Sequence, residues 1–168
     1  LLVGGPVPAW MASAGIVASV LLFIPVLVTG INLLGSLRGS HGALGWSPSL
    51  RFTATGAMAF VIAYVMGGLL ALPSFNANFF FSDVFTGQAL LLLLGFVSMC
   101  FFGAIYYIVP RLLGRPWHCD CLISLHFWFF VVGGGLAWLC LLSGGMLQGY
   151  ALNDPGVHFA SSVGFATP

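Results

Sequence analysis

Four long stretches without a charged residue dominate the sequence, at about 11–36, 52–73, 86–110 and 122–148. Each is long enough to cross a bilayer, because the hydrocarbon core needs roughly 20 apolar residues in a helix. Four Arg and three Asp are the charged residues of the chain, and all of them lie between or beyond these stretches. We therefore predict an all-α fold, a polytopic bundle of four transmembrane helices.

The composition excludes several other classes of protein. Charged residues make up 4% of the sequence, against about a quarter in a soluble domain. Such a chain cannot cover a globule with polar side chains, which excludes a soluble enzyme and a disordered tail. A net charge of +1 provides no basic surface for nucleic acid. We expect a single transmembrane domain over 1–168 that ends in a polar tail at 149–168. Because the sequence begins with Leu1 and not with an initiating Met, we expect it to be part of a longer chain.

Small residues and one proline indicate how the spans pack. Glycine recurs inside them, for example at 67–68, 133–135 and 144–145. Small residues let helix backbones approach closely where lipid provides no hydrophobic drive for association. Pro25 lies inside the first stretch and predicts a kink there, because proline removes a helical hydrogen bond.

The positive charges gather on one side of this topology. The first and third loops, which share that side, carry four arginines together with Asp120: Arg38, Arg51, Arg111 and Arg115. Asp83, in the second loop, and Asp154, in the tail, lie on the other side. Since cytoplasmic loops are enriched in Lys and Arg, we predict that the arginine-bearing loops are cytoplasmic. The tail then lies in the periplasm if the membrane is a bacterial inner membrane.

A short motif in the third loop contains groups that bind metals. His118, Cys119, Asp120 and Cys121 follow one another, and two thiols with an imidazole would suit zinc or copper if a partner closed the site. Two cysteines at this spacing form half a site, so His118, Cys119 and Cys121 are weak candidates. We interpret His126, which opens the fourth span, as a histidine at the membrane interface, hydrogen-bonded to a backbone carbonyl.

Several segments resemble the catalytic subunit I of cbb3-type cytochrome c oxidases, in the haem–copper oxidase superfamily. Their order and spacing fit four consecutive spans of that family, and the likeness covers about residues 5–150. The segments are Pro8-Ala9-Trp10, Leu50-Arg51-Phe52, AIYYIVPRLLGR at 104–115, LISLHFW at 122–128 and GMLQG at 145–149.

The same resemblance implies that the metal ligands of the family are missing. The family has a His-x-His pair before its Tyr-Tyr-x-x-Pro-Arg signature, and the matching positions here are Gln88 and Leu90. A family glutamate falls near Met66. The family's copper-binding His-His falls at or before residue 1. Haem and copper are therefore expected in a partner or in missing spans, with none in this segment. We expect leucines, Phe101 and Phe102 to fill the vacated volume.

The resemblance favours a non-catalytic membrane subunit of a cbb3-like cytochrome c oxidase or a related respiratory complex, with a structural or assembly role. The expected partners are other membrane subunits, among them a catalytic oxidase subunit and cytochrome c subunits, together with lipids and without nucleic acid. The alternative is part of a divergent or split oxygen- or nitric-oxide-reducing subunit whose ligands lie outside this segment. A third interpretation is an unrelated membrane protein, such as a transporter fragment or an assembly factor.

Overall fold

The computed structural model describes residues 8–36, 42, 45, 47–154 and 156, and within them it contains helices and no strands. Four candidate spans run over Ala9–Leu33, Pro48–Leu70, Val84–Leu113 and Asp120–Leu152. This confirms the predicted all-α fold with four spans. The spans are built from α1 (Ala9–Leu21), α2 (Phe23–Ser36), α4 (Pro48–Leu70), α6 (Val84–Leu90), the π-helix η1 (Leu91–Ser98), α7 (Met99–Leu113) and α8 (Asp120–Leu152). The short helix α5 (Pro73–Phe79) lies between the second and third spans.

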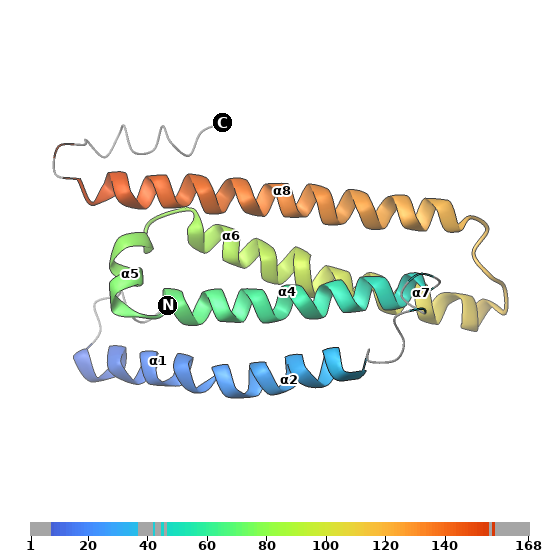
Figure 1. The fold of residues 1–168 in the computed structure, drawn as a ribbon, viewed down its shortest axis with the longest axis horizontal. Coiled ribbons are helices and arrows are strands. Elements are labelled where there is room, and N and C mark those ends of the chain that lie inside the picture. The colour runs from blue at the N-terminus through green and yellow to red at the C-terminus, as the bar shows by residue number, and fades with distance from the viewer. Residues whose placement is uncertain (1–7, 37–41, 43–44, 46, 155, 157–168) are drawn as a thin grey trace.

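The long helices lie roughly parallel in one elongated bundle (Figure 1). The α1–α2 pair packs on α4, and α4 packs on η1 and α7. The third span in turn contacts α8 through α6, while the short helix α5 contacts α8 at the end where the second loop lies. Successive spans are therefore neighbours in the bundle, as is usual where antiparallel helices have short connections.

Proline marks two irregularities within the spans. The first span is interrupted at Leu22, between α1 and α2, one turn before Pro25. Pro25 has no N–H to donate to the carbonyl of Leu21, so the regular hydrogen-bond pattern fails there. In the third span, Pro110 lies inside α7, which continues to Leu113. Gly114 caps the end of this helix with a φ of 63°.

The carbonyl that Pro110 leaves without a partner finds one in the next loop. A proline at position 110 removes the helical bond to the carbonyl oxygen of Tyr106. The indole Nε1 of Trp117 donates a long hydrogen bond of 3.5 Å to that oxygen. This contact ties the loop between α7 and α8 to the helix that precedes it.

The middle of the third span is a π-helix over Leu91–Ser98. Its wider turn is visible in the hydrogen bond from Ser98 Oγ to the carbonyl oxygen of Leu93, five residues earlier, at 3.0 Å. The helix α6 precedes it and α7 follows it without a loop. Short π-helical segments occur mostly within α-helices, and frequently at functional sites. The run of leucines gave no sign of it in the sequence.

Glycines set the close contacts between helices. A methyl group on Gly145 of α8 would overlap the backbone nitrogen of Val84, and one on Gly103 of α7 would overlap the hydroxyl of Thr53 on α4. At the same place, Ser49 Oγ donates a 2.8 Å hydrogen bond to the carbonyl oxygen of Gly103. The predicted role of small residues in bringing backbones together is thus visible at both interfaces.

Amide side chains connect the helices at the end opposite the arginines. Gln148 Oε1 accepts a 3.0 Å hydrogen bond from the backbone N–H of Asp83, just before α6. Nδ2 of Asn153 donates to the carbonyl oxygens of Gly149, at 2.8 Å, and Asn78, at 3.4 Å.

The described outer surface of the spans is apolar, with Trp128 and Phe129 on α8 exposed by 58% and 71%, as suits a surface that faces hydrocarbon.

The contact of Gly145 with α6 leads to a stability prediction. Gly145→Ala should lower the free energy of unfolding by about 1–3 kcal/mol, because the added methyl group meets backbone that cannot yield. Unfolding in mixed detergent micelles, followed by tryptophan fluorescence, measures the loss.

Gly133→Ala is the matched control on the same helix, since nothing lies within 4 Å of a methyl group there. It should leave stability unchanged or raise it slightly, because alanine favours helix over glycine. Equal effects of the two substitutions would contradict the assigned packing.

Candidate functional site

Gln88, on α6, faces the first span. A Cβ added to Gly67 of α4 would overlap Nε2 of Gln88, so the amide lies directly over this glycine. The same side chain lines a cavity of about 180 Å³ whose other polar members are Ser19 and Tyr64. It also borders a larger cavity of about 600 Å³ between the first span and α6, where Asn76 contributes a second amide.

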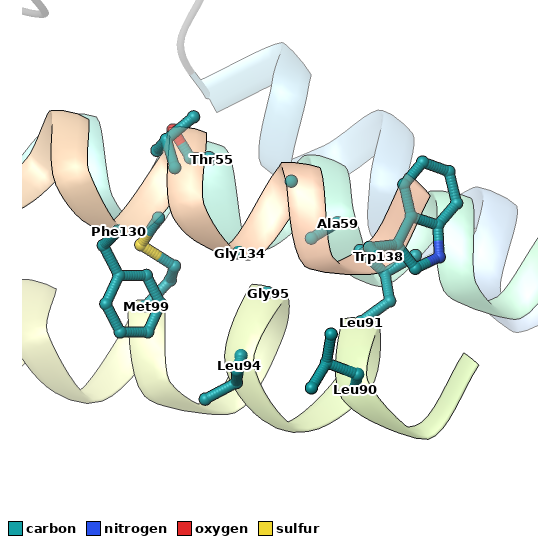
Figure 2. A pocket seen from close by; sticks show the side chains of 12 residues that line it. Thr55, Ala59, Leu90, Leu91, Leu94, Gly95, Met99, Phe130, Gly134 and Trp138 are labelled. Carbon is teal, nitrogen blue, oxygen red and sulfur yellow. The ribbon is translucent and has the colours of Figure 1, made fainter. Parts of the chain in front are cut away.

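Leu90, two residues further on, faces the other side of the third span. It lines a cavity of about 110 Å³ whose wall comes from α4, η1, α7 and α8, with Thr55, Gly134 and Trp138 among its members. Figure 2 shows Leu90 and Trp138 toward one end of this cavity, with Met99 and Phe130 toward the other. The indole nitrogen of Trp138 is buried and has no hydrogen-bond partner among the described residues.

The residues at these two places do not fit an axially ligated haem. Haem iron in helical proteins is held by His, Met, Cys or Tyr, and the hydrocarbon side chain of Leu90 has no donor atom. The amide of Gln88 is not in that set of ligands either. A cavity of about 110 Å³ beside Leu90 holds a few atoms rather than a porphyrin. The assignment of Gln88 and Leu90 to the family's ligand positions stays a prediction.

The filling of the vacated volume by leucines and Phe102 stays a prediction. Phe102 packs against a core cluster of Phe52, Met99 and Ile123. Phe101 instead is 65% exposed, so its expected place in the interior was wrong: it precedes Phe102 on the helix and points to the outer face. The leucine run contributes Leu90, Leu91 and Leu94 to the lining of the smaller cavity.

A histidine–tyrosine pair forms the best-defined polar contact between two spans. The hydroxyl of Tyr106 on α7 and Nδ1 of His126 on α8 are hydrogen-bonded at 2.8 Å, half-buried. In the neutral Nε2–H tautomer the hydroxyl donates and Nδ1 accepts. We expected His126 to bond a backbone carbonyl, and this was wrong: a side chain on the neighbouring span provides the partner.

Aromatic rings hold this pair in place. Phe52, which is 0% exposed, has its ring centroid 5.2 Å from that of Tyr106 and 5.4 Å from that of His126. Phe102 meets the imidazole edge-on at 4.6 Å, and the indole of Trp117 meets the Tyr106 ring edge-on at 5.5 Å. We call these three rings and the pair the aromatic box. Its geometry fixes both side chains in one orientation.

The box draws together several segments that the sequence comparison singled out. Phe52 ends the Leu-Arg-Phe segment, Tyr106 belongs to the Tyr-Tyr-x-x-Pro-Arg segment and His126 to His-Phe-Trp. Sequence reasoning missed the hydrogen bond itself. A signal was present, because two side chains able to bond each other begin and end adjacent spans near the same face of the membrane.

The candidate metal motif is exposed. His118, Cys119 and Cys121 all lie on the surface between α7 and the first turn of α8. Within the part of the chain that the structure describes, no three His, Cys, Asp or Glu side chains form a group that could hold a metal. Metal binding by this motif with a partner stays a prediction. Arg38 lies outside the described residues, as do two further histidines of the sequence, His41 and His158.

Four apolar spans, joined through close glycine contacts and an aromatic box, define a polytopic helical membrane protein. The family described as "Cytochrome C and Quinol oxidase polypeptide I" has a model that matches residues 2–167. The chain belongs to this family, which confirms the resemblance to subunit I.

Three bacterial relatives show how much of a subunit the chain represents. It is 32% identical, over 93% of its length, to cbb3-type cytochrome c oxidase subunit CcoN1 of Stutzerimonas stutzeri, and covers 34% of that protein. It is 29% identical, over 75% of its length, to a cytochrome c oxidase subunit 1 homolog of Agrobacterium tumefaciens and to cytochrome c oxidase subunit 1 of Rhodobacter capsulatus, covering 24% of each. The chain therefore spans about a third or less of the length of these relatives.

The hydrogen bond in the aromatic box leads to a second stability prediction. Tyr106→Phe should lower the free energy of unfolding by about 1 kcal/mol, because it leaves Nδ1 of His126 without its partner. Tyr107→Phe, at a neighbouring ring that is 53% exposed, is the control and should have little effect.

A double-mutant cycle with His126→Phe isolates the pair. We expect a coupling energy of about 0.5–1.5 kcal/mol between positions 106 and 126, measured in the same micelles. A coupling near zero would show that the hydrogen bond does not stabilise the protein.

Proposed function

We propose that the chain is a non-catalytic membrane component of a cbb3-like cytochrome c oxidase or a related respiratory complex, with a structural or assembly role. The observation that carries this proposal is the chemistry of the third span. Gln88 and Leu90, which match the family's haem-ligand positions in our comparison of motifs, face opposite sides of the span with an amide over Gly67 and an alkyl group in a small cavity. Neither is a strong ligand for iron.

The packing supports a scaffold. The helices approach each other at glycines, as at Gly145 against Val84, and the aromatic box joins the second, third and fourth spans. These interactions serve cohesion of the bundle. Its outer faces are apolar and can meet other membrane helices or lipid.

In this proposal the redox groups belong to other parts of the complex. The resemblance to subunit I implies haem and copper in a partner or in other spans, while this segment holds none. The partners are other membrane subunits, including a catalytic oxidase subunit and cytochrome c subunits. They contact the exposed faces of the bundle.

Cofactor analysis of the purified chain tests the proposal. We expect no Soret band in a reduced-minus-oxidised absorbance spectrum, and haem and copper far below one per polypeptide by pyridine haemochrome assay and elemental analysis. A catalytic subunit I purified in the same detergent is the positive control. Stoichiometric haem in this chain would contradict the scaffold role.

A second candidate is part of a divergent or split oxygen- or nitric-oxide-reducing subunit whose ligands lie elsewhere. The observation that favours it is the 32% identity to CcoN1 over 93% of the chain. In that case the chain copurifies with a haem-bearing piece, and its removal abolishes the oxidase activity of that piece. Removal of a scaffold instead lowers the amount of assembled complex and leaves the activity per haem unchanged.

The arginine-bearing end faces the cytoplasm of a bacterial inner membrane in this proposal, and the tail faces the periplasm. Figure 1 shows that α4 begins and α7 ends at one end of the bundle, and that α6 begins at the other. Arg51 is in the first turn of α4 and Arg111 in the last turn of α7, whereas Asp83 directly precedes α6. This distribution fits the preference of cytoplasmic loops for positive charge.

Two native thiols report this orientation. Cys119 and Cys121 are exposed at the arginine-bearing end, so a membrane-impermeant maleimide should label them only after spheroplasts are permeabilised. In a background lacking both thiols, Asp154→Cys should react in intact spheroplasts. Labelling of Cys119 and Cys121 without permeabilisation would reverse the proposed orientation.

A further inference from the structure

A cavity of about 470 Å³ lies where α7 ends and the chain turns toward α8. Its lining combines apolar side chains with basic and aromatic groups. The residues that line it are Val109, Pro110, Leu113, Arg115, Pro116, Trp117 and His118.

This cavity is not buried inside the bundle. It opens beside an exposed loop at one end of the bundle, with Arg115, Trp117 and His118 all exposed. Trp117 is held in place by its hydrogen bond to the carbonyl oxygen of Tyr106. A tryptophan at the end of a span is typical of the membrane–water interface, so the cavity lies at the depth of lipid headgroups.

The charge of the cavity comes from Arg115. The other arginine of this turn, Arg111, is occupied elsewhere: its guanidinium lies 3.4 Å from the ring centroid of Tyr107, and its Nη1 donates to the carbonyl oxygen of the same residue at 3.4 Å. The acid of this turn, Asp120, is in the first turn of α8 and outside the lining. Arg115 therefore presents its positive charge to whatever enters the cavity.

An apolar strip runs from the cavity along α7. Ile105, Val109 and Leu113 follow one another at intervals of four residues, which places them on one helix face. Leu113 is 69% exposed and Ile105 is 44% exposed. The strip points from the charged turn toward the hydrocarbon core, so polar and apolar surfaces are continuous.

We propose that this cavity binds an anionic phospholipid. The guanidinium of Arg115 bonds the headgroup phosphate in the charge-assisted geometry that arginine and phosphate share, the indole of Trp117 borders the glycerol region, and one acyl chain lies along Ile105, Val109 and Leu113. A free anion would use the charge and leave the strip unused, and a zwitterionic lipid would leave the charge of Arg115 uncompensated. Basic pockets between transmembrane helices bind acidic lipid headgroups in this manner.

Lipid binding to the full chain in detergent tests this site. Delipidated protein is titrated with phosphatidylglycerol or phosphatidylcholine of the same acyl chains, and bound lipids are counted by native mass spectrometry. We expect one phosphatidylglycerol to bind more tightly than phosphatidylcholine, and Arg115→Gln to weaken it about fivefold, the effect of roughly 1 kcal/mol for one arginine at the membrane surface.

Arg111→Gln is the matched control, because it removes the same charge from the same turn but affects a guanidinium that is bound to Tyr107. Arg111→Gln should weaken phosphatidylglycerol binding by less than twofold. Arg115→Lys should retain part of the preference for phosphatidylglycerol over phosphatidylcholine. Equal weakening by Arg111→Gln and Arg115→Gln would indicate attraction by net charge alone and overturn the site.

Two further outcomes would also overturn the proposal. One is equal affinity for the two lipids. The other is displacement of phosphatidylglycerol by millimolar inorganic phosphate, which would indicate an anion site without a lipid. Circular dichroism of each variant verifies that the helices are intact, so that loss of binding can be assigned to the cavity.

Discussion

In hydrocarbon every backbone N–H and C=O must find its partner within the protein, and the rest of this structure depends on that constraint. It explains why the described spans are built of helices, and why their irregular places matter. Pro110 deprives the carbonyl of Tyr106 of its usual donor, and the indole of Trp117 bonds it from the following loop. The same tryptophan ring packs against Tyr106, so the repair of the backbone and the assembly of the aromatic box depend on one side chain.

The sequence contained enough information for the number of spans, because charge cannot be buried cheaply in a membrane and every charged residue lay outside the four apolar stretches. It also indicated the close approach of helices at glycine, later seen at Gly145. The π-helix over Leu91–Ser98 could not be predicted, because a run of leucines has the same composition in either helical form. The difference arises from packing between spans.

The residues of the candidate site could be predicted from the sequence, but their spatial arrangement could be predicted only in part. Motif spacing identified Gln88 and Leu90, and side chains two residues apart on a helix point to opposite faces. Which spans they meet, the first and the fourth, depends on how the third span is rotated among its neighbours. Likewise, the sequence identified His126 but not its bond with Tyr106, because that contact exists only when two spans have their native vertical register. Contacts between helices belong to the tertiary structure, and local sequence patterns do not specify them.

The length of α8 has a mechanical consequence. Its 33 residues extend about 50 Å at 1.5 Å per residue, whereas the hydrocarbon core is about 30 Å thick. An average tilt of about 20° shortens the projection by only about 3 Å, so tilting cannot hide the excess. The helix must extend beyond the core as a stiff rod, equivalent to about three helical turns shared between its two ends. Any movement of the fourth span is therefore transmitted, as through a lever, to the water-facing surface of the membrane.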